Sequence, residues 1–149
     1  MNKEKSIFGW LTIDMIIFSL EILAVIIFYG DRLSVLGSMG FFEILLFGLA
    51  TYRVANIIST EKITKPLRAP FVDEVEENGK TVEKPKTSGW AGATGYLIHC
   101  PACTGVWVAT TFVSLYIFLP NAAYFLGFIF ALSAVERIIA HVSLHLKRE

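Results

Sequence analysis

The chain has 149 residues, of which 54% are hydrophobic and 17% are charged, and its formal net charge is zero. Soluble domains carry about 25% charged residues, so this composition and the mean hydropathy of +0.59 favour a membrane protein. The zero net charge gives no electrostatic reason to expect a nucleic-acid partner. Two cysteines, three positions apart, exclude a scaffold built on several disulfides.

Four apolar segments predict membrane-spanning helices, because about 20 apolar residues cross a hydrocarbon layer of about 30 Å. They cover residues 11–29, 41–58, 101–119 and 122–143. The first follows Lys3 and Lys5, as in a signal peptide, but it contains Asp14 and Glu21 and lacks a small-residue cleavage site. We therefore expect an all-α membrane protein with four transmembrane helices, in which the first span is retained.

The basic residues of the connections predict the orientation of these spans. The connection of residues 59–99 contains Lys62, Lys65, Arg68, Lys80, Lys84 and Lys86. Two more basic residues lie in each terminal segment, whereas the two remaining connections together contain one, Arg32. Both termini and the 59–99 connection are therefore predicted to be cytoplasmic, which an even number of spans allows.

The 59–99 connection has patterns of its own. Residues 72–83 alternate apolar and charged side chains around Asn78-Gly79, a pair that suits a two-residue turn, so they predict a solvated β-hairpin; the alternative is a flexible charged tip. Residues 88–98 are small and aromatic, with Trp90 and Tyr96, and predict a short helix at the level of the lipid headgroups.

Small residues mark a packing face in the last span. Ala123, Gly127 and Ala131 recur every four residues, and such stripes allow close approach of helix backbones. The preceding Pro120-Asn121 predicts a short turn. The third and fourth spans should therefore pack antiparallel.

Glu21 lies near the middle of the first span and is a functional candidate by default, because an ionised carboxylate is costly in lipid. The alternative, which we favour, is a protonated side chain hydrogen-bonded to Thr110, Thr111 or Ser133. Under the first interpretation Glu21 would be central to a small channel or holin-like protein.

Asp14 and Arg53 are expected at similar depths near the cytoplasmic side if the first two spans are antiparallel. We predict an ion pair between them, with Arg53 extending to the headgroups as the alternative. Glu136 and Arg137 lie similarly deep in the fourth span and are candidates for the same network.

The motif Cys100-Pro101-Ala102-Cys103 begins the third span. Proline suits the first turn of a helix, and a cysteine at that position experiences the helix dipole, which stabilises its thiolate. Three interpretations remain open: a packing pair, a redox pair, and a metal site. The predicted cytoplasmic location disfavours a lasting disulfide.

A zinc site would need two further ligands. His141 and His145 are four residues apart near the cytoplasmic end of the fourth span, and His99 precedes Cys100. An antiparallel arrangement would bring His141 near the depth of Cys103. The sequence therefore permits zinc as a cofactor.

Three motifs carry a family resemblance. They are Tyr-Arg-Val-Ala-Asn-Ile-Ile at 52–58, Thr-Lys-Pro-Leu-Arg-Ala-Pro-Phe at 64–71, and Cys-Pro-Ala-Cys-Thr-Gly-Val-Trp at 100–107. Over about residues 45–140, the chain resembles the bacterial membrane proteins grouped as domain of unknown function 1360, some of which are labelled sporulation proteins. Members often have tryptophan where this chain has Ala102. The resemblance implies the bacterial cytoplasmic membrane and supplies no reaction.

No nucleophile–base pair or phosphate-binding loop is evident, which favours a non-enzymatic scaffold or partner subunit related to sporulation or the envelope. Its contact surface would be the cytoplasmic connection, with Arg68, Pro66, Pro70 and Phe71 as candidates. The partner would be a membrane or cytoplasmic protein, or a second copy in a homo-oligomer. The alternative is a membrane thiol oxidoreductase or metal-binding protein that uses Cys100 and Cys103.

Overall fold

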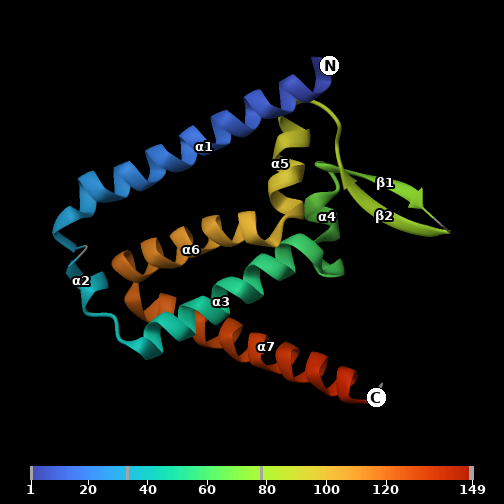
Figure 1. Cartoon of the computed structure of the whole chain (residues 1–149). Coiled ribbons are helices and arrows are strands. Elements are labelled where there is room, and N and C mark those ends of the chain that lie inside the picture. The colour runs from blue at the N-terminus through green and yellow to red at the C-terminus, as the bar shows by residue number, and fades with distance from the viewer. Residues whose placement is uncertain (1, 33, 78, 148–149) are drawn as a thin grey trace. The chain divides into compact units, whose positions relative to one another are not determined.

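The computed structural model describes residues 2–32, 34–77 and 79–147 (Figure 1). The contacts within the chain divide it into two compact units. The hairpin unit comprises Met1–Ala24 and Asn56–Thr104, and the helical unit comprises Val25–Ala55 and Gly105–Glu149. Each unit is described by itself below.

Four helices are long and apolar enough to cross a membrane, and each corresponds to one predicted span. They are α1 (Asn2–Tyr29), α3 (Phe41–Thr60), α6 (Pro101–Phe118) and α7 (Pro120–Leu146). The apolar part of α1 is Ser6–Ile27. The helix itself begins earlier than the predicted span because lysine and glutamate, which dominate its polar start, are good helix formers.

The junction between α6 and α7 differs from the prediction of a turn at Pro120-Asn121. Both of these residues belong to the first turn of α7, and Leu119 alone separates the two helices. Proline is favoured at a helix start, where its missing N–H group needs no partner. The Ala123 N–H group donates to the Leu119 carbonyl at 3.0 Å, which closes that first turn.

The predicted β-hairpin is confirmed. Strand β1 (Val72–Glu77) pairs antiparallel with β2 (Lys80–Pro85), and Asp73 lies opposite Lys84 in the register. Gly79 has a φ of +74°, which glycine adopts without steric cost. Asn78, the other residue of the predicted turn, lies outside the described residues.

Four short helical segments were not predicted. They are η1 (Gly30–Arg32), α2 (Ser34–Gly37), η2 (Lys62–Thr64) and α4 (Lys65–Arg68). The short helix predicted from residues 88–98 is present as α5 (Gly89–His99).

Helix α5 packs directly against the base of the hairpin (Figure 1). A Cβ atom on Gly95 would lie 2.3 Å from the Phe71 carbonyl oxygen, and one on Gly92 would lie 2.4 Å from the Lys86 carbonyl oxygen. The Phe71 ring also contacts the Trp90 ring, with centroids 5.3 Å apart. The two glycines therefore let the helix approach the hairpin backbone.

The predicted small-residue stripe of α7 is buried inside the helical unit. Ala123, Gly127 and Ala131 are all buried, and a Cβ atom on Gly127 would lie 3.0 Å from the Phe47 ring of α3. The stripe therefore serves to pack α7 against α3. Phe47 also contacts three other rings at centroid distances of 5.6–5.8 Å, namely those of Phe112, Tyr116 and Tyr124.

Candidate functional site

The buried polar side chains of the described chain gather in the hairpin unit. They are Ser59, Arg68 and Thr104, with exposed fractions of 2%, 3% and 7%. With Thr64 and Glu83, to which Arg68 is bonded, they form a cluster that we call the polar junction. It forms near the end of α3, because the last four carbonyl groups of a helix lack intrahelical partners.

Arg68 is the centre of this junction. Its Nη1 donates to the carbonyl oxygens of Ile58 at 3.0 Å and Glu61 at 2.9 Å, and to Thr64 Oγ1 at 2.7 Å. Its Nε donates to Glu83 Oε2 at 2.9 Å. The guanidinium thus caps the C-terminal end of α3, where a cation is also favoured by the helix dipole, and it ties that end to strand β2.

Arg68 is therefore a buried residue that stabilises the 59–99 connection and not an exposed contact residue. Of the other predicted contact residues, Pro66 and Pro70 are exposed, whereas Phe71 is half-buried against Trp90. The burial of Arg68 was missed because its position in α4 depends on the path of the chain after α3. The sequence signal that could have indicated its contact with Thr64 is the spacing of four residues between them.

Thr104 connects the ends of three helices that meet in the hairpin unit. Its hydroxyl group donates to the Leu97 carbonyl oxygen at 2.9 Å and accepts a hydrogen bond from Ser59 Oγ at 3.2 Å. Leu97 belongs to the last turn of α5, Ser59 to that of α3, and Thr104 to the first turn of α6. The hydroxyl therefore satisfies a terminal carbonyl of α5 and holds the helix ends together.

The two cysteines lie beside this connection. Cys100 Sγ and Cys103 Sγ are 2.8 Å apart, both thiols are free, and both side chains are partly exposed. Cys100 Sγ accepts hydrogen bonds from the Cys103 thiol and from the Cys103 backbone N–H at 3.4 Å. These bonds lower the pKa of the Cys100 thiol, because they stabilise its thiolate.

The predicted zinc ligands divide between the two units. His141 and His145 have ring centroids 4.9 Å apart on an exposed part of α7 in the helical unit. Cys100, Cys103 and the exposed His99 belong to the hairpin unit. Among the described residues of either unit, no three His, Cys, Asp or Glu side chains are placed to share a metal ion. The four-ligand site remains a prediction.

Arg53 is engaged within the helical unit, where its Nε donates to Ser133 Oγ of α7 at 2.7 Å. Asp14 belongs to the hairpin unit, and its buried Oδ2 accepts no hydrogen bond from the described residues. The Asp14–Arg53 pair remains a prediction. The Glu21 and Glu136 side chains are exposed, and their proposed roles also remain predictions.

Glu43 joins α3 to α7 and was missed in the sequence. Its Oε2 accepts a hydrogen bond from the Gly40 N–H at 3.0 Å, and its Oε1 accepts one from the Tyr124 hydroxyl at 3.3 Å. A glutamate three residues after the helix cap, just before an apolar run, resembles half of a capping box. That spacing was the signal that could have found it.

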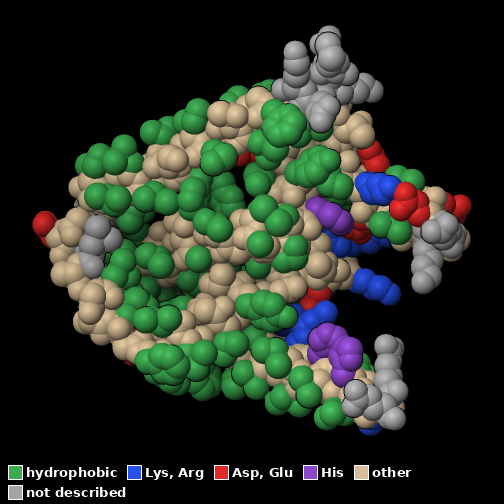
Figure 2. Space-filling view, in the orientation of Figure 1, with side chains coloured by type: hydrophobic (Ala, Val, Ile, Leu, Met, Phe, Trp, Pro, Cys, Tyr) green, Lys and Arg blue, Asp and Glu red, His purple; other side chains and the backbone are tan. Residues whose placement is uncertain are grey.

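Charged and apolar side chains are concentrated on different parts of the visible surface (Figure 2). Acidic and basic side chains gather over the hairpin, and apolar side chains cover much of the visible faces of α1 and α7, although the C-terminal end of α7 also shows histidine and basic side chains. The charged surface of the hairpin unit is therefore the part suited to water.

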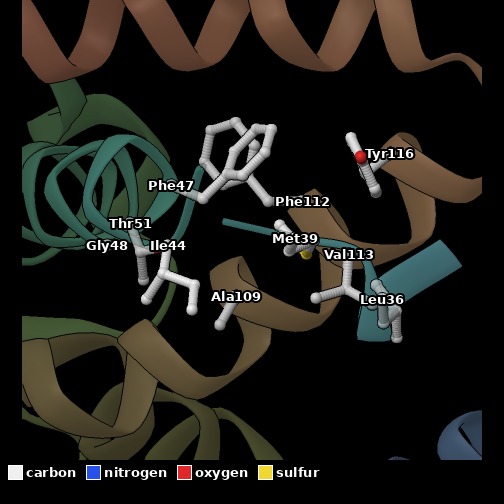
Figure 3. A pocket seen from close by; sticks show the side chains of 10 residues that line it. All are labelled: Leu36, Met39, Ile44, Phe47, Gly48, Thr51, Ala109, Phe112, Val113 and Tyr116. Carbon is white, nitrogen blue, oxygen red and sulfur yellow. The ribbon is translucent and has the colours of Figure 1, made fainter. Parts of the chain in front are cut away.

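An apolar groove of 340 Å³ lies in the helical unit (Figure 3). Its lining residues are Leu36, Met39, Ile44, Phe47, Gly48, Thr51, Ala109, Phe112, Val113 and Tyr116. None of them carries a charge at neutral pH. The groove can accommodate an apolar group, and its lining offers no acid–base or metal chemistry.

Comparison with known proteins gives the family. The family described as "Protein of unknown function (DUF1360)" matches residues 46–143. The chain is 37% identical over 112 residues to UPF0713 protein YngL of Bacillus subtilis (strain 168), covering 73% of this chain and 79% of that protein. It is 34% identical over 101 residues to Sporulation protein YjcA of the same organism, covering 64% of this chain and 86% of that protein. No solved structure matches significantly.

The family match contains both of the motifs that build the polar junction. Residues 64–71 provide Thr64 and Arg68, and residues 100–107 provide Thr104 together with both cysteines. The match covers most of the chain, and this protein therefore belongs to the family of proteins of unknown function DUF1360.

Proposed function

We propose that this protein is a non-enzymatic component of the bacterial cytoplasmic membrane, in which α1, α3, α6 and α7 are the spans. Large apolar side chains that face outward support this assignment, among them Met15, Ile27 and Phe125, with exposed fractions of 71%, 67% and 67%. Such extensive apolar exposure is unfavourable in water and is expected where helices face lipid.

In this proposal the hairpin lies in the cytoplasm and contacts a partner protein. The basic residues of the connection support the orientation. The similarity to a sporulation protein of Bacillus subtilis supports a role in sporulation or in the envelope changes that accompany it.

The observation that carries the proposal is the bonding of Arg68. A flexible connection between two spans needs no buried arginine, because burying a charge is costly unless every bond is made. Here Nε donates to Glu83, and Nη1 donates to Ile58, Glu61 and Thr64. The result is an ordered platform, and a preorganised surface loses less conformational entropy when it binds.

The outer face of the hairpin has the composition of a small contact surface. Val75 and Val82 lie opposite each other and are 38% and 39% exposed. Asp73 lies opposite Lys84 next to them, and Lys84 is also paired with Glu77. An apolar centre with a charged rim is the usual arrangement in protein–protein interfaces.

Other exposed residues support a membrane-proximal position of the connection. Ile63 and Leu67 are 79% and 63% exposed beside α3, and Trp90 and Tyr96 are 50% and 54% exposed on α5. Tryptophan and tyrosine are enriched at the headgroup level. These side chains would anchor the platform to the bilayer surface.

In-cell photocrosslinking tests the contact. A photoreactive phenylalanine analogue at Val75 should give a discrete protein adduct in the native bacterium. The adduct should disappear with Arg68→Met, which loosens the platform, and persist with Lys62→Met, which alters an exposed lysine. Crosslinks to lipid alone, or an adduct unaffected by Arg68→Met, would refute the docking role.

Labelling of intact cells tests the orientation. In a variant with both native cysteines changed to serine, Ser34→Cys should react with a membrane-impermeant maleimide, whereas Thr87→Cys should react only after permeabilisation. Both positions are exposed. The reverse pattern would place the hairpin outside the cell.

A further inference from the structure

We propose that Cys100 and Cys103 form a reversible thiol–disulfide couple, with a disulfide of a protein or of a small molecule as its oxidant. The inference rests on the geometry of the cysteine pair and does not depend on the proposed docking role. Cys100 acts as the nucleophile and Cys103 as the resolving thiol.

The two thiols are not at disulfide distance, but they lie close to it. The two Sγ atoms are already 2.8 Å apart, and a disulfide bond brings them to about 2.05 Å. Cys100 precedes Pro101, and Cys103 lies in the first turn of α6. The sulfurs therefore have less than about 1 Å to move within one short, ordered segment.

A metal site is a poorer fit to the same residues. Structural zinc takes four ligands, with the sulfur atoms about 2.3 Å from the metal, so two thiolates would have to move apart. Within the described part of the hairpin unit, no third His, Cys, Asp or Glu completes a group with these cysteines. The described residues therefore provide neither the further ligands nor the sulfur separation that zinc needs, whereas a disulfide needs only the two sulfur atoms.

The hydrogen bonds assign the nucleophile. Cys100 Sγ accepts from both the thiol and the backbone N–H of Cys103, and it lies before the positive end of the α6 dipole. The lowered pKa of Cys100 agrees with this arrangement. A larger thiolate fraction at neutral pH makes Cys100 the thiol that attacks first.

The reaction is a two-step exchange. The Cys100 thiolate attacks one sulfur of the oxidant, forming a mixed disulfide and releasing the other sulfur as a thiolate. Cys103 then loses its proton to solvent and attacks Cys100 Sγ, which forms the Cys100–Cys103 disulfide and releases the second thiolate. The dithiol gives up two electrons, and the oxidant is reduced to two thiols that take up the released protons.

The couple is placed to affect the polar junction. Cys103 is followed directly by Thr104, whose hydroxyl holds Leu97 and Ser59. Oxidation also removes the Cys103 thiol as a donor to Cys100. The redox state of the pair therefore changes the bonding at the start of α6.

A redox titration of the full-length protein in lipid nanodiscs tests the proposal. The protein is equilibrated in buffers with varied ratios of reduced to oxidised glutathione, and free thiols are trapped with a maleimide that shifts the band on a gel. Both thiols should disappear together in one two-electron transition. Two free thiols at every ratio would overturn the proposal, and so would full protection of both by stoichiometric zinc.

Single variants test the order of attack. With oxidised glutathione, Cys103→Ala should accumulate a glutathione adduct on Cys100, whereas Cys100→Ala should form an adduct on Cys103 at least several-fold more slowly. Equal rates would overturn the assignment of the nucleophile. Mass spectrometry of the intact protein distinguishes these species.

The pH dependence of alkylation provides a second readout. A free thiol has a pKa of about 8.5, and the Cys103 bonds lower that of Cys100. In the reduced wild-type protein, Cys100 should therefore reach its half-maximal rate with iodoacetamide below the pH typical of a free thiol. In Cys103→Ala the midpoint should move upward. An unchanged midpoint would show that Cys103 does not activate Cys100.

Discussion

The hairpin unit and the helical unit are stabilised by different kinds of interaction. The hairpin unit buries Arg68, Ser59 and Thr104 and satisfies each with hydrogen bonds. The helical unit packs small and aromatic side chains, with Gly127 against Phe47. The difference follows from what each unit has to stabilise, helix ends in the hairpin unit and helix faces in the helical unit. Helix ends leave carbonyl groups that require donors, whereas helices in lipid associate through close packing.

The comparison predicts two kinds of sensitivity to mutation. A buried polar network fails when one member is removed, because its partners remain desolvated and unpaired. A packed face responds in proportion to the volume that is added or lost. The following variants test that contrast, in order of expected effect.

Arg68→Met should have the largest effect. Removing one member of a buried charge pair costs about 3–5 kcal/mol, because the other charge stays buried without its partner. Here Glu83, with a side chain only 17% exposed, would be left behind. Hydrogen exchange should show the amides of β1 and β2 losing protection, and denaturant titration in detergent would give the free energy of unfolding. A loss below about 1 kcal/mol would mean that Arg68 does not organise the connection.

Gly127→Leu tests the packing of the helical unit. A leucine side chain must displace the Phe47 ring, which already lies 3.0 Å from the Cβ position, and overpacking of this kind costs about 1–3 kcal/mol. Gly48→Leu is the matched control, since nothing lies within 4 Å of its Cβ position and leucine is the better helix former. Equal losses of thermal stability in the two variants would contradict the packing role of the stripe.

Thr104→Val removes one hydroxyl group from the polar junction at nearly constant volume. The expected loss is about 1 kcal/mol, because Ser59 and the Leu97 carbonyl lose a partner in a buried position. Thr111→Val is the control, since its exposed hydroxyl donates to the Trp107 carbonyl of its own helix. If both variants unfold at the same temperature, Thr104 does not connect the helix ends.

The sequence was informative wherever local chemistry decides the structure. Apolar runs located the four long helices, Asn78-Gly79 located the hairpin, and Pro101 marked the start of α6. Proline chemistry also explains the error at Pro120, which opens α7 and does not belong to a turn.

The polar junction could not be predicted in the same way. Arg68 reaches Glu83 and the carbonyl of Ile58 only because α4 folds back beside the end of α3. Its charge suggested an exposed position, since arginine is rarely buried. The contact between Ser59 and Thr104 likewise joins residues that are 45 positions apart. Long-range contacts of this kind leave no periodic signal in the sequence.

The smallest effect is expected for Lys65→Met, which removes the other ion pair between α4 and the hairpin. Lys65 Nζ lies 2.7 Å from Glu74 Oε1, but the two side chains are 48% and 53% exposed, and water screens such pairs. The hydrogen bond to Glu74 raises the pKa of Lys65 above 10.5. Any stabilisation from this shift is therefore fully present below that pH and is lost only as the pH rises through the raised pKa.

Between about pH 6 and pH 9, where lysine stays protonated, the unfolding curves of Lys65→Met and the wild-type protein should therefore run parallel and nearly coincide. Arg68 and Lys65 lie in the same short helix and each is paired with a glutamate of the hairpin. If Lys65→Met destabilised the protein as much as Arg68→Met, burial would not be what distinguishes the two pairs. The charge pattern of the hairpin would then stabilise it, and raising the salt concentration should weaken the wild-type protein more than either variant.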